Sequence, residues 1–459
     1  MNRWIIWNVF FRLHEKLKGH ATFSMLKEME AAERLSPAGL EELRRKKLRD
    51  LIDYAYAHVP YVRSRMEEAG IAPGRIREPR DLELLPLMRK ADVRANRERL
   101  RSDIAGKLAS FTTGGSTGEP LIFDLAKRRV ASRVACRQRT SRWWGVWVGD
   151  PELAIWGAPV ELKRQDHIRN LRDRFLASRL LSAFEMNEQT ISSYLDAIER
   201  GPCLQLFGYP SAIHQLCLQA RKEGRNLRGL GIKVVFVTGE VLFPHQRELI
   251  TETLNSPVAN GYGGRDSALI AHECPSGGMH VLSDAVILEL IGSDGRPVPP
   301  GEIGEIVITD LYSHEAPFIR YATGDMAIAS SNQCPCGRPL PLLERIEGRS
   351  NDSIVTPDGR VINSLAAIYG VREIEGVEKF RICQKRLDCF HVQLMCNGHF
   401  PADGEGRIRE AWRKLFRVPL EVTFEYVDSF PAERSGKFRH IVSEVVLDRA
   451  DIAALRIKI

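Results

Sequence analysis

Residues 110–120 read Ser110-Phe111-Thr112-Thr113-Gly114-Gly115-Ser116-Thr117-Gly118-Glu119-Pro120, and the interpretation of the chain starts from this stretch. Glycine permits turns with positive φ, so successive amides of such a loop can point inward, and the hydroxyl side chains add further donors. The apolar run Leu121-Ile122-Phe123 follows directly. The stretch therefore predicts a turn between two strands that can close around a phosphate group.

Two other motifs compete for the same residues. The phosphate loop of P-loop NTPases needs a lysine after its last glycine, where Glu119 stands here. The order Gly114-Gly115-Ser116-Thr117-Gly118 fits the nucleophile elbow of serine hydrolases, but that motif needs a helix straight after the serine. A hydrolase stays open as a minor alternative, and so does a solvated turn without any ligand.

Composition limits the class of protein. The chain has 459 residues and a net charge of +7, from 66 Lys and Arg against 59 Asp and Glu, with no long basic block. We expect about two or three domains and no nucleic-acid partner. Nine cysteines, an odd number, do not suggest a disulfide framework. A reducing compartment fits better, and we expect a cytoplasmic protein.

The N-terminus begins with the apolar run Trp4-Ile5-Ile6-Trp7-Asn8-Val9-Phe10-Phe11, which charged residues interrupt from Arg12 onward. It is too short to span a bilayer. The pattern predicts an amphipathic helix that packs on the body of the protein. Weak contact of this helix with a membrane surface stays open.

The order of helical and strand patterns predicts an α/β protein with two domains. Residues 1–101 form a helical N-terminal region of a large domain, 1–348. The β-branched run Ile232-Lys233-Val234-Val235-Phe236-Val237-Thr238 predicts a strand buried on both faces, and a helix follows at 244–254. From 281 the pattern changes to hairpins. We place a small α+β domain at 349–459.

Four further segments offer groups that could bind a nucleotide. Two of them pair a tyrosine with a carboxylate across a glycine-containing turn, the third carries an arginine at the domain boundary, and the fourth carries a lysine in a Ser-Gly turn. They are Tyr262-Gly263-Gly264-Arg265-Asp266, Tyr321-Ala322-Thr323-Gly324-Asp325, Gly348-Arg349-Ser350-Asn351-Asp352 and Pro431-Ala432-Glu433-Arg434-Ser435-Gly436-Lys437-Phe438-Arg439.

Together and in this order, these segments resemble the adenylate-forming superfamily of acyl- and aryl-CoA ligases. The similarity is to its phenylacetate-CoA ligase-like branch, which includes coenzyme F390 synthetase-like proteins and adenylating proteins of capsular polysaccharide biosynthesis. It runs from about Phe111 to Arg439 and extends to Phe207-Gly208-Tyr209-Pro210-Ser211 and Thr238-Gly239-Glu240.

The resemblance implies a large α/β domain, a small mobile C-terminal domain and a role for each motif. ATP phosphates would lie on Thr112, Thr113, Gly114, Gly115, Ser116, Thr117 and Gly118, and the rest of the nucleotide on Gly239, Glu240, Tyr262, Gly263 and Asp325. Asp266 would direct Mg²⁺, Arg349 would lie near the ribose, and Lys437 would bridge the attacking carboxylate and the α-phosphate. An acid pocket would use Phe207, Tyr209, Ser211 and Gly261.

The expected reaction is ATP-dependent activation of a carboxylic acid, by resemblance an arylacetate, with transfer to coenzyme A. An amine or a carrier-protein thiol as acceptor, and a non-catalytic nucleotide-binding component, stay open, as does a homodimer. Two positions depart from the family pattern. Leu121 stands where many members carry lysine, and Asp266 is one methylene shorter than the usual glutamate.

Three cysteines and one histidine form a candidate structural zinc site. Cys274 and His280 lie close together in the sequence, and Cys334 and Cys336 flank a proline 60 residues later. Three thiolates and an imidazole make a closed tetrahedral set for zinc. Two alternatives stay open: His272 in place of His280, or separate reduced thiols.

Overall fold

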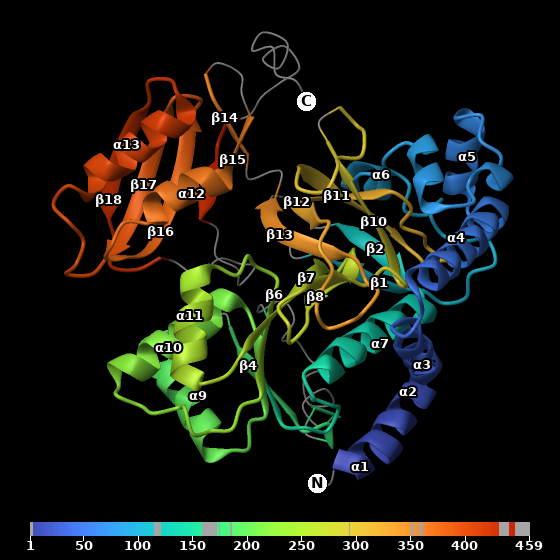
Figure 1. The fold of residues 1–459 in the computed structure, drawn as a ribbon, viewed down its shortest axis with the longest axis horizontal. Coiled ribbons are helices and arrows are strands. Elements are labelled where there is room, and N and C mark those ends of the chain that lie inside the picture. The colour runs from blue at the N-terminus through green and yellow to red at the C-terminus, as the bar shows by residue number, and fades with distance from the viewer. Residues whose placement is uncertain are drawn as a thin grey trace.

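The computed structural model describes residues 3–113, 121–157, 172–173, 175–183, 186–292, 294–349, 353–357, 361–430 and 440–445. Figure 1 shows a large α/β body and a smaller body built from the C-terminal part of the chain.

One large mixed sheet runs through the large body. Within the described ranges it has eleven strands in the order β10-β11-β12-β13-β9-β8-β7-β6-β5-β3-β4. The parallel half consists of β3 (Glu152–Trp156), β4 (Ser178–Ser182), β5 (Gln205–Gly208), β6 (Val234–Thr238) and β7 (Val258–Gly264). The antiparallel half consists of β8 (Ala268–Glu273), β9 (Met279–Val281), β10 (Val286–Ile291), β11 (Ile303–Asp310), β12 (Tyr321–Ser330) and β13 (Leu342–Arg349).

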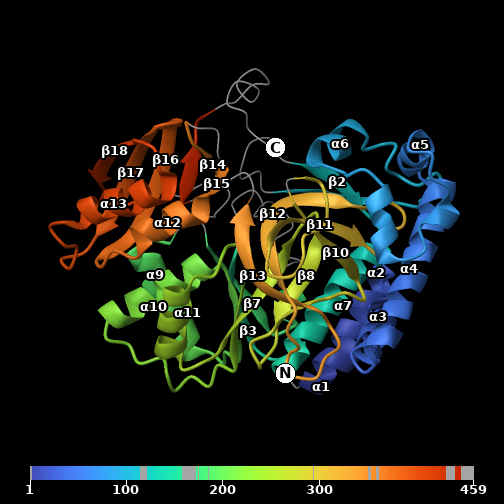
Figure 2. The same ribbon diagram turned by 45° about the horizontal axis from the view of Figure 1, so that its top comes forward.

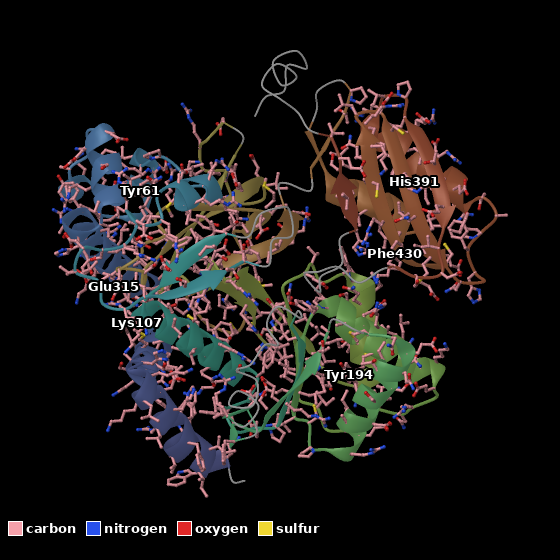
Figure 3. All side chains as sticks on the ribbon, turned by 180° about the vertical axis from the view of Figure 1, so that it is seen from behind. Tyr61, Lys107, Tyr194, Glu315, His391 and Phe430 are labelled. Atoms are coloured by element: carbon pink, nitrogen blue, oxygen red, sulfur yellow. The ribbon has the colours of Figure 1, made fainter. Side chains whose placement is uncertain are left out.

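Three helices cover the parallel half: α9 (Glu188–Arg200), α10 (Pro210–Lys222) and α11 (Pro244–Leu254). Each presents an apolar stripe to the strands, as Ile191, Leu195 and Ile198 do on α9. Tyr194, labelled in Figure 3, donates from its hydroxyl to the carbonyl of Ser182 at 2.8 Å. The sheet and these helices bury one continuous core.

The N-terminal helices line the outer side of the antiparallel half and of the helix that follows β2 (Figures 1 and 2). They are α1 (Arg3–Ile5), the π-helical segment η1 (Ile6–Phe11), α2 (Arg12–Lys18), α3 (Thr22–Ala32), α4 (Pro37–His58), α5 (Pro60–Glu68), the 3₁₀ turns η2 (Pro73–Arg75) and η3 (Pro79–Leu84), and α6 (Lys90–Ala95). The next long helix, α7 (Lys127–Trp143), packs on α3 and β8.

The C-terminal body has its own sheet and core. Its four strands in the order β18-β17-β16-β19 are β16 (Val377–Arg386), β17 (Cys389–Cys396), β18 (Glu421–Tyr426) and β19 (Ile441–Ser443). The helices α12 (Ser364–Arg372) and α13 (Gly404–Phe416) lie on one face (Figure 2), and Trp412 and Phe416 fill the space between. A short hairpin precedes them, β14 (Ser353–Val355) and β15 (Val361–Asn363).

The predicted fold class is confirmed: an α/β body is followed by a smaller α+β body. The run at 232–238 forms the buried strand β6, and the helix at 244–254 is α11. No helix in the described part of the chain is long and apolar enough to cross a membrane.

Candidate active site

The glycine-rich stretch lies in a hairpin. Strand β1 (Ala109–Thr112) pairs antiparallel with β2 (Ile122–Leu125), and Thr112 faces Ile122. The pair closes with the Thr113 amide donating to the Leu121 carbonyl and the Leu121 amide donating to Thr113 Oγ1, both at 3.0 Å. A strand thus follows the loop, and among the described residues the next helix begins at Lys127. A nucleophile elbow would lead from its serine into a helix, so the strand argues against the hydrolase alternative. Gly114, Gly115, Ser116, Thr117 and Gly118 lie outside the described residues.

In the two tyrosine-carboxylate motifs, each tyrosine hydrogen-bonds to the aspartate of the other motif. Tyr262 on β7 donates its hydroxyl to Asp325 Oδ2 on β12 at 2.7 Å. In return, Tyr321 at the start of β12 donates to Asp266 Oδ2, just beyond β7, at 2.6 Å. Burial and the facing carboxylate raise the pKa of both phenols, so each stays a neutral donor. The pairs hold Asp266 and Asp325 near each other, and both carboxylates are half-buried.

Two arginines of α7 support the turn that carries Asp266. Arg129, fully buried, donates to Asp310 Oδ2 at 2.7 Å and also to the Asp266 carbonyl. Arg133 donates to the Gly264 carbonyl at 2.9 Å. The motif pattern missed these arginines because they lie in a helix more than 130 residues away. They fix the backbone from which the Asp266 side chain extends.

The hairpin and the carboxylates belong to one site. Arg265 donates to the Thr112 carbonyl at 3.2 Å, so the turn at 262–266 touches the end of β1. Arg349 lies directly opposite Asp325 in the β12–β13 register. The side chain of Arg349, the turn that carries Lys437, and Ser350-Asn351-Asp352 lie outside the described residues.

The candidate acid pocket lies where β5 and β6 end. The Tyr209 ring stacks on Trp156, the last residue of β3, with ring centroids 4.1 Å apart. Gly239 has φ +83°, and a Cβ there would lie 3.0 Å from the Tyr209 ring, so the pair needs glycine at this position. The ring centroids of Phe207 and Trp156 are 5.2 Å apart.

The remaining pocket and nucleotide residues lie nearby along the same strands. Glu240 Oε2 accepts from the Ser211 amide at 3.1 Å. Gly261 is buried against His272, and Gly263 runs so close to the Ala268 carbonyl that no Cβ fits. The structure therefore brings Phe207, Tyr209 and Ser211 together. Trp156 packs against Phe207 and Tyr209, although it belongs to none of the quoted motifs.

The predicted metal ligands form one cluster. The ligand atoms of Cys274, His280, Cys334 and Cys336 all lie within 4.8 Å of one another. The Sγ atoms of Cys274 and Cys334 are 3.5 Å apart, and His280 Nε2 is 3.2 Å from Cys336 Sγ. This gathering contradicts the alternative of separate thiols.

The surroundings of the cluster orient its ligands. His280 Nδ1 faces the Leu340 carbonyl at 3.1 Å, which directs Nε2 toward the thiols. A Cβ at Gly278 would lie 2.7 Å from Cys334 Sγ, so the turn admits only glycine. His272 lies opposite His280 in the β8–β9 register, its Nδ1 is 2.8 Å from the Glu273 carbonyl, and it is not among the residues whose ligand atoms gather within 4.8 Å. His272 is therefore excluded as a member.

A seam joins the two bodies near the acid pocket. The Arg372 guanidinium of α12 lies over the Phe243 ring at 3.1 Å from its centroid, and the His440 ring lies 5.9 Å from Phe243. Burial, with the charge of Arg372, lowers the pKa of His440 to about 3, so its imidazole stays neutral. Phe430, labelled at this side of the C-terminal body in Figure 3, has Arg381 over its ring. Phe430 and His440 flank the segment that carries Lys437.

The C-terminal part of the chain matches a known protein family. Residues 354–444 match the family model described as the CapK C-terminal domain. Protein CapK of Staphylococcus aureus is 23% identical over 368 residues, which cover 79% of this chain and 80% of that protein. The phenylacetate-coenzyme A ligase of Thermus thermophilus is 24% identical over 340 residues, which cover 69% and 72% of the two chains.

Solved structures show the same fold. A crystal structure of 2-hydroxyisobutyryl-CoA ligase in the postadenylation state has a TM-score of 0.73 and 21% identity, with 93% of each chain covered. The same ligase in its thioesterification state has a TM-score of 0.61 at the same coverage.

Proposed function

We propose, from the confirmed resemblance of the chain to the phenylacetate-CoA ligase-like branch of the adenylate-forming superfamily, that it is an AMP-forming acid-thiol ligase. A carboxylate of the substrate attacks the α-phosphorus of ATP, an acyl-adenylate forms and pyrophosphate leaves. The thiol of coenzyme A then displaces AMP, and a thioester forms.

The crosswise tyrosine-aspartate pairs carry this proposal. They place two carboxylates at the edge of one sheet, and Arg265 connects their turn to the hairpin that holds the phosphate loop. A nucleotide-binding site needs both kinds of group, because the phosphates accept hydrogen bonds and the ribose hydroxyls donate them. A carboxylate already oriented by a neutral tyrosine is ready to accept two ribose hydroxyls.

Each residue has a proposed task. The loop 112–118 donates to the ATP phosphates, and Tyr262 provides an aromatic face for adenine. Asp325 accepts from the ribose hydroxyls, with Arg349 opposite it in the register. Lys437 stabilises the charge that develops when two anionic groups meet, which is the main barrier in such an attack. As a point charge on a turn, it can arrive after the substrates have bound.

Asp266 suits a magnesium ion. The Tyr321 hydroxyl donates to Oδ2. Oδ1 lies beside Gly264, 2.9 Å from the position that a Cβ would take there, and Ser267 Oγ lies 2.8 Å from the same position. Mg²⁺ keeps several waters and takes only one or two carboxylates, so a water can span the missing methylene. When bound, the ion would supply positive charge to the phosphates. Arg129 holds the backbone carbonyl of Asp266, and the Tyr321 hydroxyl holds its carboxylate.

The cluster of three cysteines and His280 suits zinc. Its four ligand atoms are close enough to share one ion, and the imidazole is oriented by a carbonyl. We assign it a structural task, because a set of four protein ligands leaves no open position for a substrate. It ties the β8–β9 turn to the segment before β13.

The domain boundary near Arg349 is part of the proposal. The large domain, 1–348, holds the nucleotide, and the small one, 349–459, turns about Asn351 and Asp352 between the two half-reactions. The core of the C-terminal body, which includes Trp412 and Phe416, is separate from that of the large body, and this supports a unit that can turn as a whole. All nine cysteines are free, which supports the cytoplasm as the site of action.

A second candidate keeps the first half-reaction and changes the acceptor to an amine or a carrier-protein thiol. The C-terminal domain, which would face the acceptor, matches the CapK C-terminal domain family, whose description identifies no acceptor, so coenzyme A stays the first candidate. The substrate acid is proposed as aromatic because Trp156, Phe207 and Tyr209 supply rings at the strand ends.

The first experiment measures pyrophosphate release from Mg-ATP with a panel of aryl and alkyl acids, with and without coenzyme A. We expect acid-dependent release, and Lys437→Ala lowers it by a factor of about 100 or more, because charge stabilisation at the transition state is lost. Lys414→Ala, an exposed lysine of the same domain, is the matched control.

Three outcomes separate the candidates. Pyrophosphate release that increases when coenzyme A is added supports the ligase. Pyrophosphate release that increases only with hydroxylamine or another amine supports the second candidate. No release with any acid, in a protein that binds ATP, favours a non-catalytic nucleotide-binding component. Equal turnover of Lys437→Ala and the control would contradict the role of the lysine.

A further inference from the structure

The N-terminal helix has one face buried against the body. The segments α1, η1 and α2 follow one another without a break over residues 3–18. Ile6, Phe11 and Glu15 point inward and are at most 4% exposed. Trp7 and Phe11 contact the Phe23 ring of α3, with centroids 5.0 and 5.5 Å away. These contacts confirm that the N-terminal helix packs on the body.

The opposite face is also apolar. Large hydrophobic side chains recur along it with exposed fractions of 39 to 79%: Trp4, Ile5, Val9, Leu13 and Leu17, which we call the outer stripe. An ordinary surface helix carries polar residues on this side. Figure 3 shows the side chains of this helix extending into solvent at the edge of the molecule, away from the C-terminal body.

The N-terminal helix includes a π-helical segment, in which buried and exposed residues recur at a wider spacing. In an α-helix, positions five apart lie well off one line, because a turn has 3.6 residues. Across the wider turn of η1 (Ile6–Phe11), Ile6 and Phe11, five residues apart, are both buried, and Trp4 and Val9 are both exposed. From Val9 onward, spacing of four continues through Leu13 to Leu17. A π-segment of this kind often marks a functional position.

The exposed charges of the helix itself are all positive, and one of them, Arg3, pairs with Asp150 of the body at 3.3 Å. Arg3, Arg12, Lys16 and Lys18 are exposed on residues 3–18. The carboxylate of the same segment, Glu15, is buried, where it accepts from Thr22 and lies 3.2 Å from His20 Nδ1. The exposed side of the helix therefore combines an apolar line, a tryptophan near one end and positive charge.

We infer that the outer stripe docks the protein on an anionic lipid surface. An interfacial helix needs apolar residues that enter the headgroup region, basic residues that meet lipid phosphates, and a tryptophan at the boundary. A stable protein partner would engage about 20–30 residues a side, whereas the stripe offers five on one convex helix. The contact would hold the enzyme at the membrane without altering its active site.

The test is flotation of the full-length protein with vesicles of phosphatidylcholine alone or mixed with phosphatidylglycerol. We expect binding to the anionic vesicles and a loss of about tenfold or more in the double variant Leu13→Ser/Leu17→Ser, because both side chains leave the acyl boundary. The matched control is Ile104→Ser/Leu218→Ser, which replaces two exposed apolar residues on other elements.

Charge is tested with Arg12→Gln/Lys16→Gln and with added salt, since screening weakens attraction to phosphates. Both should reduce binding several-fold, while pyrophosphate release stays unchanged. Retained binding of the apolar variant, or no binding of the wild type to any vesicle, would overturn the inference. So would a dimer in light scattering that Leu13→Ser/Leu17→Ser dissociates in the absence of vesicle binding, because the stripe would then meet a second copy.

Discussion

The tyrosine-aspartate pairs and the cysteine-histidine cluster draw on the same two stretches of chain. Tyr262 and Asp325 are 63 residues apart, and Cys274 and Cys334 are 60 apart. The order β12-β13-β9-β8-β7 in the sheet brings both sets together. One arrangement of strands thus builds two sites with different needs.

The sites differ in what holds them together. In the tyrosine-aspartate site each carboxylate meets a neutral donor, so the groups satisfy each other before any ligand binds. The cluster gathers four electron-pair donors, which repel one another once the thiols are ionised. The first site is therefore paired without a ligand, whereas we expect the second to depend on a cation for stability.

The largest effect should come from removing metal ligands. The change Cys334→Ser with Cys336→Ser should abolish zinc binding and lower the free energy of unfolding by on the order of 4 kcal/mol or more, since metal binding is coupled to folding. Elemental analysis and urea unfolding measure both. The control Cys389→Ser/Cys396→Ser alters two free thiols of the C-terminal domain. If the wild-type protein without metal were as stable as the wild-type protein with metal, the proposed distinction between the two sites would be wrong.

An intermediate effect is expected at the ribose carboxylate. Asp325→Ala should weaken ATP binding about tenfold, because two hydrogen bonds to a charged acceptor are lost. Zinc content should not change, since the cluster is closed by its own ligands. Isothermal titration with ATP measures the affinity, and Glu302→Ala at an exposed turn is the control. An unchanged affinity would contradict the placement of the ribose.

The smallest effect belongs to the tyrosine that orients this carboxylate. Tyr262→Phe keeps the aromatic face and removes the donor to Asp325, so ATP affinity should fall by a factor of about 3 to 10, as one hydrogen bond is worth about 1 kcal/mol. The same titration measures it. A loss as large as that of Asp325→Ala would mean that the hydroxyl itself contacts the nucleotide.

Local patterns were enough to predict many elements of both bodies. The β-branched run at 232–238 could only be a buried strand, and the apolar spacing at 406–416 predicts most of α13, which begins at Gly404. Turn residues placed the β1–β2 hairpin. The four metal ligands were also named correctly as a group, because three thiols and an imidazole share one chemistry wherever the chain brings them.

What only the tertiary structure decided was which groups meet. The motifs gave each tyrosine and aspartate no partner, and the structure pairs the hydroxyls crosswise between β7 and β12. Trp156 beside Tyr209, and Arg129 beneath Asp266, were likewise invisible to the motifs. Hydrogen bonds within an element depend on neighbours in the chain, so a sequence window contains their cause. Strand order and side-chain pairing depend instead on many weak contacts between distant segments, and those exist only after the whole chain has packed.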